Sequence, residues 1–370
     1  MRAAIDLTSL NDNFSGIERY ALNMTLELLK QNKDITFDLI FKNEIYPAFF
    51  PWKEDKQIHF HVLPGCNKLL FNQWRLPMYL NRLKADYYFF FAFPMPILLK
   101  KKHVFGTIHD MCCWDCPETM KKQMAWYFRL SYMRMAKKAE QIITISEFSK
   151  TRIQQILKVP DEKILVAYCG LSAEFMRVCD CSDDQVKKIR DKYHLPEEPY
   201  YLCLSTLEPR KNMMLLLKTY LDLYKTGKVK TKLVLAGRKG WKIDELLSEA
   251  EQNGQVIVTG FIDDKDLPMI YRLAKCFIFP SLYEGFGIPP LEAMSQGVPV
   301  ISSDASSLPE VLGNGALYFT NNDKDALGKA ILQMEKESNL KKYAENGQKR
   351  SLQFRYEKEA GKIRERLGND

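Results

Sequence analysis

The sequence predicts an α/β protein with two Rossmann-like, doubly wound domains that face an interdomain cleft. Three observations carry this prediction: strand-like runs alternate with amphipathic helical stretches, the pattern restarts near residue 199, and 370 residues suit two domains of ordinary size. Such alternation produces parallel sheets covered by helices, and their ligands bind beyond the carboxyl ends of the strands. Polar residues just after strands are therefore the candidates for function.

The amino-terminal domain is expected at residues 1–178, and the terminal helix at 354–370 is expected to cross back to it. Its first strand runs from Arg2 to Leu7, and a helix from about Ile17 follows, with apolar residues at helical spacing. The further strands of this domain are expected at 35–41, 57–62, 86–91, 103–108, 141–145 and 163–167.

The second domain is expected at residues 179–353, after a polar stretch around Cys179 to Asp184 that suits a linker. Its first strand, Tyr200 to Leu204, ends in a turn that opens a helix. Its remaining strands are expected at 232–236, 255–259, 276–279 and 298–302. Residues that follow these strands are expected to line the cleft between the domains, where ligands usually bind.

Composition and apolar segments indicate a cytoplasmic protein. Hydrophobic residues make up 46% and charged residues 27%, as in ordinary globular chains. Asp6 interrupts the apolar start, so no secretory signal is predicted. The longest apolar run, Tyr87 to Leu99, has 13 residues and two prolines, whereas a membrane span needs about 20 residues. Nine cysteines, an odd number, suit free thiols, and the C-x-x-C pair of Cys113 and Cys116 lacks a second pair for zinc.

The formal net charge of +8 is concentrated in one segment. Residues 68–138 carry thirteen Lys or Arg against four Asp or Glu, a net charge of +9. Two interpretations remain open: a solvated helix face, or a surface for anionic lipid or an anionic glycan. The stretch Met120 to Lys138 mixes lysines with aromatic residues, which suits peripheral contact with the inner face of a membrane. No nucleic-acid-binding motif accompanies the charge, so nucleic acid is not expected as a partner.

The strongest functional signal is the stretch S-L-Y-E-G-F-G-I-P-P-L-E at 281–292, just after an expected strand. Glu284 stands eight residues before Glu292, and Gly285 and Gly287 let the backbone approach a ligand closely. Exposed N–H groups at a helix start suit an anionic or polyhydroxylated ligand, and carboxylates accept hydrogen bonds from sugar hydroxyls. Taken alone, the stretch is also compatible with a turn and a helix whose glutamates face solvent.

A second polar stretch, L-E-P-R-K-N at 207–212, follows the expected strand Tyr200 to Leu204. It places Arg210 and Lys211 at the head of a helix. Cations beside the N–H groups of a helix start form a site for a diphosphate. The plain alternative is an exposed basic turn.

Two stretches of the amino-terminal domain also follow expected strands. S-G-I-E-R-Y puts Gly16 just before the first helix, and T-I-H-D ends a buried strand with His109 and Asp110. A histidine just past a strand in a ligand cleft is less often structural than a histidine elsewhere. The stretch S-E-F-S-K at 146–150 is interpreted as a helix start capped by Ser146, without chemistry.

Together these stretches resemble the retaining glycosyltransferases of family four, the GT-B class, in its mannosyltransferase-like branch. The resemblance runs in order over almost the whole chain, from Gly16 to the last helix. It implies that Glu284 contacts hydroxyls of the donor sugar and that Lys211 neutralises the leaving diphosphate. Many members carry a further arginine where this chain has Ser205, so Arg210 is expected to supply more of the charge.

The resemblance also implies the remaining contacts. Glu292 is expected to bind the ribose, and His109 is expected near the donor sugar and the reacting centre, with Asp110 in support. The catalytic residues it implies are His109, Lys211, Arg210 and Glu284. The donor-binding residues it implies are Gly16, Ser205, Phe261, Ile262, Gly285, Phe286, Gly287, Ile288 and Glu292.

The sequence favours transfer without a metal ion or another cofactor, with the nucleotide sugar as a substrate. The rival GT-A class binds a divalent ion through D-x-D, which occurs here at 264–266 and 323–325. Both triplets open expected helices, where aspartates cap the helix and complement its dipole. In the mechanism that the resemblance implies, Lys211 and Arg210 replace the metal. The departing phosphate then assists front-face attack, which retains the anomeric configuration.

The expected reaction moves a hexose from a nucleotide sugar to a saccharide or lipid-linked glycan in cell-surface polysaccharide synthesis. GDP-mannose is the expected donor, while a UDP-sugar or another GDP-sugar remains open. Two other functions are compatible with the two-domain plan: a nucleotide-sugar epimerase and a non-catalytic glycan-binding relative. The stretches at 207–212 and 281–292 together favour transfer over both.

Overall fold

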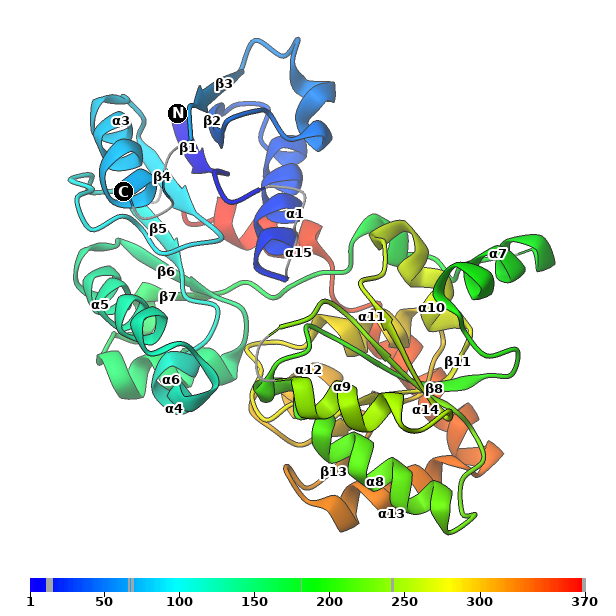
Figure 1. Cartoon of the computed structure of the whole chain (residues 1–370). Helices are drawn as coiled ribbons and strands as arrows, with labels where there is room; N and C mark the ends of the chain where they lie inside the picture. The colour runs from blue at the N-terminus through cyan, green and yellow to red at the C-terminus, as the bar shows by residue number, and fades with distance from the viewer. Residues whose placement is uncertain (11–15, 66, 68–69, 181, 241–242, 368–370) are drawn as a thin grey trace. The chain divides into compact units, whose positions relative to one another are not determined.

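The computed structural model describes residues 1–10, 16–65, 67, 70–180, 182–240 and 243–367. The chain forms two compact units (Figure 1): the first comprises Met1–Gly170 and Arg355–Asp370, and the second comprises Leu171–Phe354. Each unit contains one parallel sheet flanked by helices, which confirms the predicted α/β class with two Rossmann-like domains. Within the described ranges no helix is long and apolar enough to cross a membrane.

The sheet of the first unit consists of parallel strands in the order β3-β2-β1-β4-β5-β6-β7. Its strands are β1 (Arg2–Asp6), β2 (Thr36–Lys42), β3 (Ile58–Leu63), β4 (Tyr87–Phe90), β5 (Val104–Thr107), β6 (Gln141–Thr144) and β7 (Ile164–Val166). Each overlaps a strand expected from the sequence. The order reverses at the β1–β4 pair, where Ala4 lies opposite both Asp38 and Tyr88. Such a reversal leaves a crevice at the carboxyl ends of the two strands, where ligands of doubly wound sheets bind.

Helices of the first unit cover this sheet. They are α1 (Gly16–Gln31), α3 (Leu76–Arg82), α4 (Cys112–Asp115), α5 (Lys122–Lys138), α6 (Glu147–Leu157) and the terminal α15 (Tyr356–Arg364), with a π-helical segment, η2 (Phe71–Arg75), before α3. The terminal helix lies beside α1 (Figure 1), and the Tyr20 and Tyr356 rings are 6.1 Å apart. Ser146 caps α6, as predicted, by accepting a hydrogen bond from the N–H of Ser149 at 3.1 Å.

The sheet of the second unit consists of parallel strands in the order β10-β9-β8-β11-β12-β13. Its strands are β8 (Tyr200–Leu204), β9 (Leu233–Ala236), β10 (Val256–Gly260), β11 (Ala274–Phe279), β12 (Val300–Ser303) and β13 (Ala316–Phe319). The sequence did not predict β13, because this short edge strand is only partly buried and pairs with β12 alone. The order reverses at the β8–β11 pair, which is the switch point of this sheet.

Helices of the second unit connect these strands. They are α7 (Asp183–Tyr193), α8 (Met213–Lys225), α9 (Asp244–Glu251), α10 (Leu267–Arg272), α11 (Ile288–Ser295), α12 (Leu308–Leu312), α13 (Lys324–Met334) and α14 (Glu337–Ser351). Alternate strand residues such as Tyr201, Cys203 and Leu235 are buried against α8 and α13, which contribute Leu216 and Ile331. The intervening strand residues are buried on the other face, so both faces are covered, as in parallel sheets generally.

The two D-x-D triplets differ in their contacts. Asp323 caps α13 by accepting a hydrogen bond from the N–H of Ala326 at 2.9 Å, as predicted. The cap predicted for the other triplet is wrong, because no side chain caps α10. Instead the Asp266 carboxylate accepts hydrogen bonds from Lys192 Nζ at 2.6 Å and from the Tyr193 hydroxyl at 2.8 Å. These charged and neutral donors satisfy the carboxylate in place of the helix N–H groups.

Candidate functional site

The carboxyl ends of β8 and β11 bring together the polar stretches that the sequence singles out in the second unit. Arg210 and Lys211 lie in a 3₁₀ turn, η6 (Pro209–Lys211), that directly precedes α8. Glu284 lies in the loop between β11 and α11. The N–H of Leu282 donates to the carbonyl oxygen of Arg210 at 2.8 Å, so the two loops are joined through their backbones.

Lys211 and Arg210, which are partly exposed, form an ionic cluster with the buried Glu284. Lys211 Nζ donates to Glu284 Oε1 at 2.6 Å, and Arg210 Nη1 lies 3.3 Å from Glu284 Oε2. The same Nη1 donates to the carbonyl oxygen of Tyr283 at 2.9 Å, while the other side of the guanidinium contacts Glu208. Glu284 exposes only 7% of its surface. A buried carboxylate requires such compensation, since an isolated ionised group is strongly disfavoured away from water.

The charge state of Glu284 follows from two opposing effects. Burial raises the pKa of the carboxyl group, but the charges of Lys211 and Arg210 outweigh burial and hold its pKa below the ordinary value. Glu284 is therefore ionised at neutral pH. Together with Glu208, which pairs with Arg210 at 3.0 Å, the cluster presents two cations and two anions at the switch point of the sheet.

The backbone around Glu284 is fixed by residues that sequence reasoning did not assign to the site. The N–H of Glu284 donates to Ser306 Oγ at 2.7 Å, and Ser307 Oγ donates to the carbonyl oxygen of Glu284 at 2.9 Å. Both serines belong to the loop before α12. Their hydroxyls hold the glutamate in place through its main chain.

The loop at 285–288 approaches α12 closely. Gly287 has a φ of +100°, and a Cβ atom at this position would lie 2.7 Å from Leu308 Cδ2. Only glycine accommodates both this backbone conformation and this contact. Gly285 and Phe286 are buried, and Ile288 begins α11. The loop is therefore held rigidly at the start of the helix.

Glu292, the second glutamate of the E-x7-E stretch, lies on α11 and is buried, with 4% of its surface exposed. Its Oε2 accepts a hydrogen bond from the Tyr271 hydroxyl at 2.9 Å. Tyr271 comes from α10, and no sequence signal marked it. The contact orients the Glu292 carboxylate.

The loops after β8, β9 and β10 lie side by side at the same sheet edge. Ser205, directly after β8, donates its hydroxyl hydrogen to the carbonyl oxygen of Thr206 at 3.2 Å. Phe261 follows β10 and exposes 48% of its surface, whereas Ile262 exposes 3% and anchors the loop. Arg238 follows β9 and stacks on Phe261, with its guanidinium carbon 4.4 Å from the ring centre. Sequence reasoning missed Arg238, because a lone arginine after a strand carries no pattern.

The first unit carries the two remaining predicted residues. Gly16 opens α1, while residues 11–15 of the predicted glycine loop lie outside the described residues. His109 follows β5 and is 7% exposed, with Nε2 at 2.8 Å from the carbonyl oxygen of Phe91, just past β4. Because a carbonyl oxygen only accepts, Nε2 carries the hydrogen. Burial lowers the pKa of His109, although Asp110 opposes this effect, so the ring is neutral.

Aromatic rings surround His109. The Tyr20 ring of α1 meets it edge-on with 5.4 Å between ring centres, and the Tyr20 hydroxyl donates to the carbonyl oxygen of Ala167 at 3.1 Å. The structure therefore brings Arg210, Lys211 and Glu284 into direct contact within the second unit. His109 and Gly16 occupy the carboxyl edge of the sheet in the first unit.

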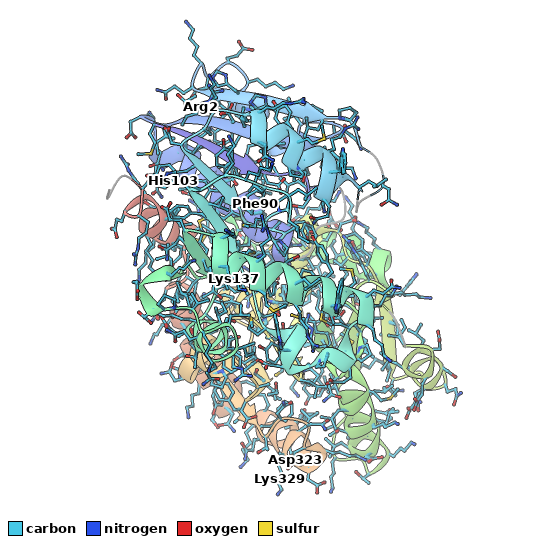
Figure 2. The ribbon with its side chains drawn as sticks, turned by 90° about the vertical axis from the view of Figure 1, so that its left-hand side faces the viewer. Arg2, Phe90, His103, Lys137, Asp323 and Lys329 are labelled. Atoms are coloured by element: carbon cyan, nitrogen blue, oxygen red, sulfur yellow. The ribbon has the colours of Figure 1, made fainter. Side chains whose placement is uncertain are left out.

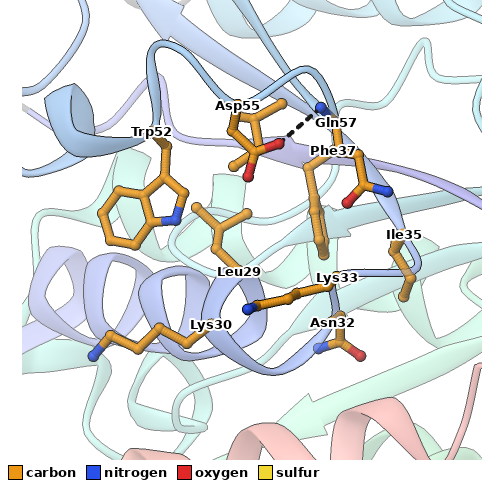
Figure 3. A pocket seen from close by; sticks show the side chains of 10 residues that line it. Leu29, Lys30, Asn32, Lys33, Ile35, Phe37, Trp52, Asp55 and Gln57 are labelled. Carbon is orange, nitrogen blue, oxygen red and sulfur yellow. Dashed lines mark hydrogen bonds between the residues drawn. The ribbon is translucent and has the colours of Figure 1, made fainter.

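One pocket of the first unit lies away from these residues (Figure 3). It has a volume of about 260 Å³ and lies where β2 and β3 begin and α1 ends. The residues that line it are Leu29, Lys30, Asn32, Lys33, Ile35, Phe37, Trp52, Asp55, Gln57 and Ile58. None of the predicted site residues borders it, because they follow the opposite ends of the strands.

The thiols and carboxylates of the described ranges show no metal-binding arrangement. No group of three or more His, Cys, Asp or Glu residues there is placed to hold a metal ion. Cys113 and Cys116 are free thiols, and burial raises the pKa of Cys113 to about 12.

Comparisons with known proteins agree with the order of the motifs along the chain. The family model described as Glycosyltransferase Family 4 matches residues 14–175, and the model described as Glycosyl transferases group 1 matches residues 185–350. The chain is 34% identical to O-antigen chain mannosyltransferase B of Escherichia coli over 255 residues, which are 68% of this chain and 66% of that protein.

A second relative is longer than this chain. The serotype-specific mannosyltransferase WbdA of Escherichia coli is 36% identical over 204 residues, which are 53% of this chain and 25% of that protein. The chain thus spans just under two thirds of one curated relative and a quarter of the other. Among solved structures, Anabaena Alr3699/HepE in complex with UDP and glucose superposes over 100% of both chains, with a TM-score of 0.73 and 17% identity. This likeness shows that the fold is GT-B.

Proposed function

The chain belongs to glycosyltransferase family 4, and from this premise we propose that it transfers a hexose from a nucleotide sugar to a glycan with retention of configuration. The proposed donor is GDP-mannose, and the proposed acceptor is a saccharide or lipid-linked glycan of a cell-surface polysaccharide. The relatives named as O-antigen mannosyltransferases support the sugar and the acceptor class. The observation that carries the proposal is the contact of Lys211 and Arg210 with Glu284.

The cluster suits a nucleotide diphosphate sugar because its groups have donors and acceptors left for one. Lys211 has three N–H donors and uses one on Glu284, so it has two for phosphate oxygens. Glu284 uses two of about four acceptor positions on the cations, and the others suit sugar hydroxyls. Arg210 contributes charge and holds the Tyr283 carbonyl, which fixes the loop that carries Glu284.

In the proposed reaction the bond between the anomeric carbon and the diphosphate oxygen breaks, and its electron pair moves to that oxygen. The acceptor hydroxyl oxygen bonds to the anomeric carbon on the same face, and its proton passes to the departing phosphate. Lys211 and Arg210 stabilise the charge that grows on the diphosphate, and each charge-assisted hydrogen bond contributes about 1.5–3 kcal/mol. These fixed cations take the place of a divalent metal ion in the proposal.

His109 has the protonation state that the proposed role requires. Its Nε2–H is engaged by Phe91, so the neutral ring keeps Nδ1 as a hydrogen-bond acceptor. A hydrogen-bond acceptor suits a sugar hydroxyl, which is the partner that the proposed role of His109 requires. Glu292 and the backbone of 285–288 complete the proposed donor contacts on the second unit.

We further propose that the first unit rests on an anionic inner membrane surface. Leu70 just before η2, Trp74 on η2 and Met78 on α3 recur at a spacing of four residues and are 62%, 63% and 43% exposed. On α5, Trp126 is 66% exposed, and Lys137 lies on the outer face (Figure 2). Exposed apolar side chains among lysines are the composition of an interfacial surface.

The two helices that carry these side chains are neighbours. Gln73 Nε2 donates to the Tyr127 hydroxyl at 3.0 Å, and Gln73 Oε1 accepts from the N–H of Ile97 at 2.9 Å. Lys121 and Lys122 at the start of α5 are exposed as well. Apolar groups would enter the headgroup region there while the ammonium groups meet lipid phosphates.

The proposed transfer is tested with a panel of nucleotide sugars. Thermal shift identifies the donor, because a ligand at 100 times its dissociation constant stabilises a protein by about 2.7 kcal/mol. Transfer to a mannose-terminated acceptor is then followed with GDP-mannose in excess EDTA, and NMR of the product gives the anomeric configuration. We expect transfer with retention in EDTA. Inversion, strict dependence on added Mn²⁺ or Mg²⁺, or epimerisation of the donor sugar without an acceptor would each contradict the proposal.

A further inference from the structure

Arg238 and Phe261 form an exposed pair at the carboxyl edge of the sheet in the second unit. The guanidinium lies over the ring at 4.4 Å, a geometry in which the ring quadrupole attracts the cation. Phe261 is 48% exposed and Arg238 is half-buried, so the pair faces solvent. The ring holds the planar guanidinium in one orientation.

The donors of this guanidinium are unused within the described part of the chain. Arg238 makes no side-chain hydrogen bond or ion pair there, and its guanidinium stacks on Phe261. Arg210, at the same edge, directs its N–H groups to Glu208, Tyr283 and Glu284. An arginine has five N–H donors in a fixed fork, and this fork matches two adjacent acceptors on a planar ligand.

The backbone of Arg238 is attached to the loop that carries the cations. Its carbonyl oxygen accepts from the N–H of Leu207 at 2.9 Å, three residues before Arg210. A Cβ atom on Gly237 would lie 1.8 Å from the carbonyl oxygen of Ser205, so only glycine allows the two loops to approach this closely. The position of Arg238 relative to Lys211 is thus fixed by main-chain contacts.

The strand order arranges these groups in a row. Glu284 follows β11, Lys211 follows β8, Arg238 follows β9 and Phe261 follows β10, and these strands are consecutive neighbours in the sheet. Three strand spacings cover about 14 Å. A donor whose sugar meets Glu284 and whose diphosphate meets Lys211 therefore extends its nucleoside toward Arg238 and Phe261.

We propose that Arg238 is a specificity-determining residue that recognises guanine, with its fork directed at the O6 and N7 atoms of the base. This inference rests on the proposed function and deepens it at the same site. Guanine presents two adjacent acceptors to an arginine fork, whereas adenine pairs its N7 with an N–H₂ donor and uracil offers O4 beside an N–H donor. Phe261 is a positioning residue that keeps the fork oriented.

The experiment compares Arg238→Gln with Lys239→Gln by calorimetric titration of the full chain with GDP and with UDP. Lys239 is the exposed neighbour, so both variants lose one positive charge at nearly the same place. We expect Arg238→Gln to weaken GDP binding about fivefold to a hundredfold and UDP binding less than twofold. Lys239→Gln should change both equally and by less than threefold. Phe261→Leu should weaken GDP binding by less than Arg238→Gln.

The outcomes separate this inference from the proposed donor. Equal weakening of GDP and UDP in Arg238→Gln, or no change in either, would overturn the role of Arg238 while transfer from GDP-mannose by the wild-type chain stands. A wild-type chain that binds UDP more tightly than GDP and transfers from a UDP-sugar would overturn the proposed donor and this inference together. Thermal unfolding of each variant shows whether a loss of binding reflects loss of the fold.

Discussion

At the carboxyl edge of the sheet in the second unit, three charged side chains lie in direct contact, whereas the same edge of the first unit presents a neutral histidine among aromatic rings. Lys211 and Arg210 both contact Glu284, which is ionised although it is buried. His109 instead donates to a backbone carbonyl and meets the Tyr20 ring edge-on. The two units share a fold, but the carboxyl edge of the sheet carries an ionic cluster in the second unit and a neutral histidine in the first.

The difference indicates a division of roles between the units. Fixed cations are suited to a diphosphate, because they stabilise charge without reorganisation during the reaction. A neutral ring and aromatic side chains are suited to sugar hydroxyls and to the apolar faces of a pyranose. Basic residues of the first unit such as Lys122, Lys137 and Lys138 lie on α5 and are exposed, which suits a surface rather than a reaction centre.

The largest effect is expected from removing the Lys211 ammonium group from the ionic cluster of the second unit. Lys211→Ala should lower turnover with GDP-mannose by about two to three orders of magnitude, by analogy with the loss of one preorganised charge stabiliser. Steady-state kinetics with the best donor measure this effect. Lys218→Ala on α8 is the matched control, since this lysine is half-exposed and pairs with Glu245. A Lys211→Ala enzyme with a near-normal rate would remove the lysine from the mechanism.

Much of this charged edge could be predicted from the sequence, because its residues directly follow recognisable strands. Arg210 and Lys211 follow β8, and Glu284 follows β11. Their contact could not be predicted from the residues alone, since Lys211 and Glu284 are 73 positions apart and meet only because β8 and β11 are neighbours in the sheet. Strand order depends on long-range pairing, which local periodicity does not encode.

The residues that hold Glu284 and Glu292 in place could not be predicted from sequence patterns. Ser306, Ser307 and Tyr271 hold the glutamates through hydrogen bonds, and isolated serines and tyrosines occur throughout any chain. The wrong cap at Asp266 has the same origin, because its partner Lys192 lies on α7, far away in sequence. The edge strand β13 was missed because it is short, only partly buried and paired with β12 alone.

Two tyrosines, one in each unit, test whether a hydrogen bond to a carboxylate stabilises the fold more than a hydrogen bond to a backbone carbonyl. Tyr271 donates to the Glu292 carboxylate, whereas Tyr20 donates to the neutral carbonyl of Ala167. Tyr271→Phe should lower the free energy of unfolding by about 1.5–3 kcal/mol and Tyr20→Phe by about 0.5–1.5 kcal/mol. Urea unfolding of both variants provides the measurement. Equal losses would show that the supporting bonds do not differ between the units.

A smaller effect is expected from removing charge at the start of α5 in the first unit, and it concerns membrane binding rather than the transfer reaction. Replacing Lys121 and Lys122 with Gln should weaken sedimentation with anionic vesicles about thirtyfold at low salt, at about 1 kcal/mol for each basic residue. Hydrolysis of the soluble donor should be unchanged. Lys324→Gln on α13 of the second unit is the control for a lost surface charge. Equal sedimentation with neutral and anionic vesicles, or none, would leave this segment as a solvated face or a glycan surface.

The smallest effect is expected from pH, and it tests whether the neutral state of His109 is a property of the fold. Burial lowers the pKa of His109 in the folded chain below the ordinary value of about 6.5. The unfolded chain therefore binds a proton more readily than the folded chain as the pH falls. The contribution of the neutral ring to stability is complete above the ordinary pKa and is lost as the pH falls through the folded-state pKa.

We expect the melting temperature of the wild-type chain to fall between pH 7 and pH 5 more steeply than that of His109→Gln. The glutamine amide can still donate to the Phe91 carbonyl but does not titrate in this range. His103→Gln is the control, because its side chain is 48% exposed and pairs with Glu140. Glu284 contributes little to this slope, since its pKa lies below the ordinary carboxyl value. Equal slopes for the wild type and His109→Gln would show that the fold tolerates the imidazolium, and the contrast between the neutral and the charged edge would then not depend on this ring.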